Sequence, residues 1–214
     1  MGAAKIRKKN GAYSTREQIA AMELQRLRED IERSFILSPA DLKLPDVPKH
    51  ARESVRAFLA PFLPGLPVKD GECWLLAQML MTLANSPRVA YVEGVWTSKS
   101  HQDQHRLGQC DCDDYGKKMF GAPHAWNTVD GHLVDLSVEN KFRVSEPEYP
   151  LDNWLHEPHR VFTHEEFKQQ EHLLDGADLC SLFVEVYNSQ ADVFRSASDR
   201  LQARYEQMVQ EAAA

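Results

Sequence analysis

Apolar side chains recur three and four positions apart over residues 15–34 and again over residues 189–211. This spacing places them on one face of a helix, so both stretches are predicted to be amphipathic helices. A shorter helix is predicted over residues 51–62, before a proline-containing break. Residues 71–85 are apolar on nearly every side. A helix of that kind belongs inside a domain, so this one is predicted to be buried.

Extended structure is predicted where β-branched and aromatic residues concentrate, over residues 88–96, 124–129, 132–138 and 182–187. The second and third of these strands are separated by Asp130-Gly131, which is a strong signal for a two-residue hairpin turn. The pattern as a whole therefore predicts an α+β fold, with a short antiparallel sheet packed on the buried helix.

Polar stretches separate these elements. Residues 97–121 are a polar excursion containing Cys, His and Asp, and residues 139–160 are predicted to be a proline-containing loop. Thr163 and Glu166 have the spacing of a capping box, which predicts a helix that runs to about Leu174.

Composition narrows the class of protein. The chain has 214 residues, 43% of them hydrophobic, and a formal net charge of −7. We therefore expect one main domain and no nucleic-acid partner. No apolar run reaches the roughly 18 residues of a membrane helix, and no apolar signal region follows the basic start. Four cysteines without a disulfide-framework spacing favour a reducing compartment, so the predicted location is cytoplasmic without membrane contact.

Three residues suggest chemistry. Cys73 falls in the first turn of the buried helix, where unpaired amides and the helix dipole favour a thiolate. A thiol nucleophile also needs a base, and the base needs a carboxylate that orients it. His124 and Asp135 supply these types in the two hairpin strands. The sequence therefore predicts a catalytic Cys73, His124 and Asp135.

The hairpin register selects His124 over the neighbouring His132. With a two-residue turn, Val129 faces His132 and Trp126 faces Asp135. His124 then shares a face with Trp126 and lies diagonal to Asp135, within reach of its carboxylate. His132 has the opposite parity and is expected to point away.

The local sequences Gly71-Glu72-Cys73-Trp74, Ser86-Pro87-Arg88-Val89, His124-Ala125-Trp126-Asn127 and Val134-Asp135 occur in this order. In that arrangement the region of residues 66–140 resembles the transglutaminase-like superfamily of papain-like folds. The resemblance implies that Cys73 is the nucleophile, His124 the general base and acid, and Asp135 the orienting residue. Trp74 and Trp126 are the predicted substrate-binding residues, and Trp126 is also expected to shield the site.

The residue pattern, together with the resemblance for the core, suggests a domain plan. It consists of a flexible basic tail over residues 1–12, an N-terminal helical segment over 13–65, a transglutaminase-like catalytic core over 66–187 and a C-terminal helix over 188–214. The implied function is cysteine-dependent acyl transfer or hydrolysis of an amide in a protein or peptide, of peptidase, deamidase or transglutaminase type, through a Cys73 thioester and without a required cofactor. Two alternatives stay open: a catalytically silent binding module and a zinc-stabilised interaction protein. Substrate identity and oligomeric state also stay open.

A second group of residues lies in the polar excursion. His101, His105, Cys110 and Cys112 offer two imidazoles and two thiols, which suit tetrahedral zinc. The alternative is a solvated acidic loop with incidental thiols, since the Cys-x-Cys gap is short and aspartates crowd the segment. Four later histidines are expected to be solvated: His156, His159, His164 and His172.

Overall fold

The computed structural model describes residues 38–66, 73–109, 120–138, 153–169 and 191–214. The chain divides into two units, residues 1–35 and 36–214, and all described residues belong to the second. Within the described ranges, no helix is long and apolar enough to cross a membrane. The predicted helix over residues 15–34 and the predicted strand over residues 182–187 fall outside these ranges.

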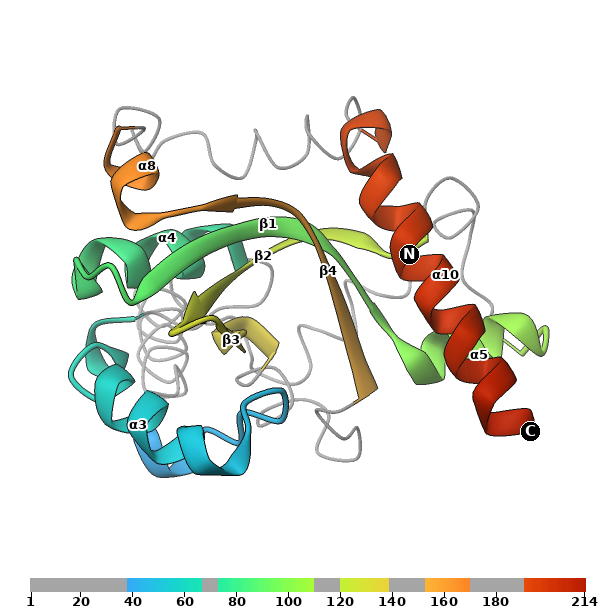
Figure 1. Ribbon diagram of the computed structural model, residues 1–214, viewed down its shortest axis with the longest axis horizontal. Helices are drawn as coiled ribbons and strands as arrows, with labels where there is room; N and C mark the ends of the chain where they lie inside the picture. Colours follow the sequence, from blue (N-terminus) through green and yellow to red (C-terminus); the bar gives the residue numbers. More distant parts are fainter. Residues whose placement is uncertain (1–37, 67–72, 110–119, 139–152, 170–190) are drawn as a thin grey trace, which may run out of the picture. The chain divides into compact units, whose positions relative to one another are not determined.

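Four strands form one antiparallel sheet in the order β3-β2-β1-β4 (Figure 1). They are β1 (Val89–Ser98), β2 (Ala122–Val129), β3 (His132–Val134) and β4 (Trp154–Phe162). The combination of this sheet with helices confirms the α+β class. The strands predicted over residues 88–96 and 124–129 are confirmed as β1 and β2.

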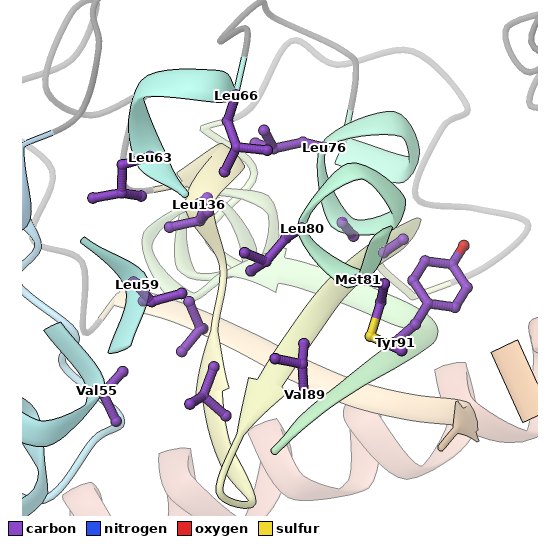
Figure 2. Packing of buried hydrophobic residues seen from close by; sticks show 14 of the residues in the cluster. Val55, Leu59, Leu63, Leu66, Leu76, Leu80, Met81, Val89, Tyr91 and Leu136 are labelled. Atoms are coloured by element: carbon purple, nitrogen blue, oxygen red, sulfur yellow. The ribbon is translucent and has the colours of Figure 1, made fainter. Parts of the chain in front are cut away.

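Helix α4 (Cys73–Ala84) packs on β1 and β2, and its buried residues include Leu76, Leu80 and Met81. The prediction of a buried helix here is confirmed. These side chains meet Val89 and Tyr91 of the sheet in the larger apolar cluster (Figure 2). Because α4 is held tightly against the sheet, Cys73 at its first described residue is fixed relative to the strands.

Helix α3 (Lys49–Leu59) corresponds to the helix predicted over residues 51–62. It borders the same apolar cluster, and two of its arginines bind the segment that precedes it. Arg56 donates to the carbonyl of Leu42 at 2.8 and 2.6 Å, and Arg52 donates to the carbonyl of Val47 at 2.8 Å. Two short 3-10 helices lie before and after α3, η1 (Pro39–Asp41) and η2 (Leu63–Gly65).

A smaller apolar cluster lies under helix α10 (Ala191–Ala213), which packs on β1 and β4. It joins Phe194 and Leu201 of the helix to Val95 and Leu155 of the strands. The amphipathic helix predicted over residues 189–211 is therefore confirmed, and its apolar face covers the sheet.

Two further helices are short. Helix α5 (Lys99–Arg106) begins after Ser98, whose side chain accepts a hydrogen bond from the amide of His101 at 3.2 Å. Helix α8 (His164–Gln169) begins with the predicted capping box. In it, Glu166 accepts from the amide and the hydroxyl of Thr163, both at 2.8 Å.

The prediction of a loop over residues 139–160 was wrong for its last part, because β4 begins at Trp154. The misleading residue was Pro158, which lacks an amide hydrogen. Proline is tolerated on edge strands and at bulges. Strand β4 lies at the sheet edge, and its register shifts opposite Glu93 and Gly94, so Pro158 satisfies both conditions.

Candidate active site

The hairpin between β2 and β3 has the predicted register, with Val129 opposite His132. Its turn residues Asp130 and Gly131 have φ values of 52° and 79°, the left-handed conformation that a two-residue hairpin turn requires. Arg88 closes the turn through two hydrogen bonds to the Asp130 carboxylate, at 2.9 and 2.5 Å. The side chain of His124 is 3% exposed, whereas His132 is partly exposed, so the predicted difference between the two histidines is confirmed.

His124 and Asp135 are joined by a buried hydrogen bond of 2.6 Å between Nε2 and Oδ2. The prediction that Asp135 lies within a strand was wrong, because β3 ends at Val134 and residues 136–138 are helical. Asp135 instead caps this turn: its Oδ1 accepts from the amides of Ser137 at 3.1 Å and Val138 at 3.3 Å. The capping role fixes one carboxylate oxygen and leaves the other for the histidine.

Cys73 is buried, with 8% of its surface exposed, and it lies close enough to His124 for its charge to raise the pKa of that imidazole. Because Nε2 of His124 is engaged by Asp135, Nδ1 is the ring nitrogen left for the thiol. The structure thus brings together all three residues that the sequence singled out, in the order thiol, imidazole, carboxylate.

Electrostatics within the group favour a charged imidazole. Burial by itself would lower the pKa of His124, but the charges of Asp135 and Cys73, together with the hydrogen bond to Asp135, raise that pKa to about 10. For Asp135, burial acts to raise the pKa. The charge of His124 and the hydrogen bonds from His124 and His156 outweigh it, so the pKa of this carboxyl lies well below its usual 3.8. Asp135 is therefore an ionised hydrogen-bond acceptor.

His156 belongs to the same group, and the prediction that it is solvated was wrong. It lies on β4, is 8% exposed, and its Nε2 is 2.7 Å from Oδ2 of Asp135. The one hint in the sequence was its place directly after the apolar pair Trp154 and Leu155. His164 is also buried, with Nε2 at 3.0 Å from Oδ1 of Asn85, whereas His159 is exposed as predicted. His172 lies outside the described residues.

Aromatic rings enclose the histidines. Trp96 stacks on His124 at a centroid distance of 4.3 Å, and the edge of Trp126 meets His156 at 5.1 Å. Trp126 is buried in this wall, which suits the shielding role expected for it. Trp74 is half-buried and packs against both apolar clusters.

The predicted zinc ligands are divided between described and undescribed segments. His101 and His105 lie one turn apart on α5, and Cys110 and Cys112 fall outside the described residues. A different group could hold a metal ion: His124, Asp135 and His156 are buried, and one ligand atom from each lies within 4.8 Å of the others. The distances of 2.6 and 2.7 Å are those of N–H···O⁻ hydrogen bonds, so a metal ion would have to replace both protons.

Comparisons of the chain with models of known families, with curated proteins and with solved structures find no match.

Proposed function

We propose that this chain is a cysteine-dependent enzyme that transfers or hydrolyses the acyl group of an amide. The observation that carries the proposal is the buried His124 imidazole, which is hydrogen-bonded to Asp135 at 2.6 Å and lies close to Cys73. A thiol, a base and an orienting carboxylate in this order are the parts that nucleophilic acyl chemistry needs.

The reaction follows from the positions of the protons. In the proposed reaction the proton of the Cys73 thiol passes to Nδ1 of His124, and the Asp135 carboxylate stabilises the resulting imidazolium through Nε2. The sulfur attacks the carbonyl carbon of the amide, and His124 gives its Nδ1 proton to the leaving amine as the C–N bond breaks. A thioester remains on Cys73. Water, or an amine, then attacks the thioester with His124 as base and releases the thiolate again.

The substrate class rests on the resemblance of residues 66–140 to transglutaminase-like proteins, which implies a protein or peptide amide. Hydrolysis is favoured over cross-linking, because the sequence contains no feature that marks a site for an acceptor amine. The backbone amide of Cys73 or of its neighbour is the proposed donor to the oxyanion that forms during attack.

Thiol mapping tests the proposal. The protein is treated with iodoacetamide near pH 7, and each cysteine is followed by mass spectrometry. Cys73 should be alkylated faster than the other cysteines, and His124→Ala should slow it. His132→Ala, on the same hairpin, is the matched control and should leave the rate unchanged. The silent binding module would be favoured instead if Cys73 reacts no faster than the other cysteines, or if His124→Ala leaves the alkylation rate of Cys73 unchanged.

The second candidate function is metal binding, which the His124, Asp135 and His156 group favours because its donors converge. Zinc at His101, His105, Cys110 and Cys112 stays a prediction as well. Metal analysis of the purified chain distinguishes the two, because His156→Ala should remove metal from the buried group and His101→Ala from the other. Protein that carries metal at the buried group would contradict the acyl-transfer proposal, since that metal displaces the protons on which His124 relies.

A further inference from the structure

His156 occupies a position that the acyl-transfer mechanism above leaves without a role. Its Nε2 lies 2.7 Å from Oδ2 of Asp135, the same oxygen that receives Nε2 of His124 at 2.6 Å. The side chains of His124 and His156 are both about 4% exposed or less. One buried carboxylate oxygen therefore serves two histidines.

The protons in this group can be assigned. Asp135 is ionised and can only accept hydrogen bonds, so both Nε2 atoms carry protons. Within the described residues, no group lies within hydrogen-bond reach of the buried Nδ1 of His156. The side-chain hydrogen bond of His156 to Asp135 is therefore the one through which it can act on the site.

The backbone around His156 is held from the neighbouring helix. Arg204 of α10 donates to the His156 carbonyl at 2.8 Å, and Arg200 donates to the Pro158 carbonyl at 2.7 Å. Both arginines also bind the carboxylate of Glu157, at 3.3 and 2.7 Å. This anchoring keeps the His156 ring in one place beside Asp135.

A cavity adjoins this group. A small cavity of about 20 Å³ adjoins Asp135 and His156 and is lined also by Leu44, Leu133 and Val138. That volume holds about one water molecule. Among the described residues, Asp135 and His124 lie beside the His156 ring, Arg204 binds its carbonyl, and Asp46 lines the cavity.

We propose that His156 is a positioning residue for the acyl-transfer site: it pins Oδ2 of Asp135 toward His124 and keeps water away from the bond between them. This inference rests on the proposed function. Excluding water lowers the local dielectric, so the carboxylate holds the imidazolium more strongly. A stronger hold on the imidazolium keeps Cys73 reactive at lower pH.

The test compares three replacements of His156 by the pH profile of Cys73 alkylation with iodoacetamide. His156→Gln places an amide donor near the position of Nε2, whereas the shorter His156→Asn does not reach it. His156→Ala removes the donor and opens the cavity. We expect Ala and Asn to shift the profile upward by about one pH unit, a roughly tenfold slower reaction on its acid side. The His156→Gln variant should keep the wild-type pH profile. His159→Gln, on the same strand, is the control and should also keep it.

The outcomes separate this inference from the function beneath it. If wild-type Cys73 reacts fast and depends on His124, but the Asn and Gln variants behave alike, the positioning role is wrong and the proposed function stands. If wild-type Cys73 is slow or independent of His124, the proposed function itself fails. Should the Ala variant not fold by circular dichroism, the comparison of Gln with Asn still decides.

Discussion

At the scale of single residues, Asp135 is the centre of the site. Its two oxygens accept from Nε2 of His124, Nε2 of His156, the amide and hydroxyl of Ser137 and the amide of Val138. A buried carboxylate is costly unless such donors surround it. Because the donors come from β2, β4 and the turn after β3, the carboxylate also ties these elements together.

Asp135→Asn tests the charge while it keeps the shape. The amide can still cap the turn, but it offers no negative charge to His124 and presents hydrogens to one of its donors. We expect alkylation of Cys73 at pH 7 to fall by roughly tenfold or more, since the imidazolium loses its main support. Iodoacetamide kinetics measure this. An unchanged rate would mean that Asp135 serves only as a helix cap.

The raised pKa of His124 predicts how stability depends on pH. Its pKa is about 10 in the folded chain against an ordinary 6.5, so the stabilisation is fully present below pH 6.5 and is lost as the pH rises through about 10. The free energy of unfolding should therefore fall between pH 7 and pH 9. Urea melts across this range measure it. His124→Gln should flatten the dependence, and parallel curves for both proteins would contradict the assignment.

At the scale of elements, local signals predicted the site well where they were short and specific. Asp130-Gly131 fixed the hairpin register, and the register alone distinguishes His124 from His132. Strand β4 could not be predicted in the same way, because it contains Pro158. A proline is compatible with a strand at a sheet edge or a bulge, and both features are known only once the pairing of β4 with β1 is known. His156 was missed for that reason, since its burial depends on contacts with distant elements.

Gly94 explains how β4 comes close enough to deliver His156. A Cβ atom at Gly94 would lie 2.2 Å from the Glu157 carbonyl oxygen and 2.6 Å from the ring of Trp126. Gly94→Ala should therefore push β4 outward, destabilise the fold and slow alkylation of Cys73. Gly131→Ala is the comparison, because its Cβ meets nothing within 4 Å and only its φ of 79° opposes it.

Thermal melts and Cys73 kinetics on both glycine variants decide the point. Gly131→Ala should cost about 1 kcal/mol and leave the reactivity of Cys73 unchanged. Gly94→Ala should lose both stability and reactivity. Equal behaviour of the two variants would show that β4 does not need the close approach to β1.

At the scale of the whole described unit, two apolar clusters support one site. The larger lies between α4 and the sheet, and the smaller lies between α10 and the strands β1 and β4. Trp74, the residue after Cys73, packs against both. Strand β1 also contributes to both, through Tyr91 and Val95. The position of Cys73 therefore depends on α10 even though that helix supplies no proposed catalytic group.

Leu201→Ala tests this dependence from the smaller cluster. Leu201 is a fully buried residue of α10, so its truncation should cost about 2–5 kcal/mol. If the clusters unfold together, the denaturant midpoint falls for every probe alike: helix content, tryptophan fluorescence and the fast alkylation of Cys73. Leu80→Ala, in the larger cluster, should also lower the denaturant midpoint of all three probes together. A variant that loses helix content while Cys73 keeps its fast alkylation would show that α10 folds apart from the site. In that case the anchoring of His156 by Arg204 could not be what holds the buried histidine in place.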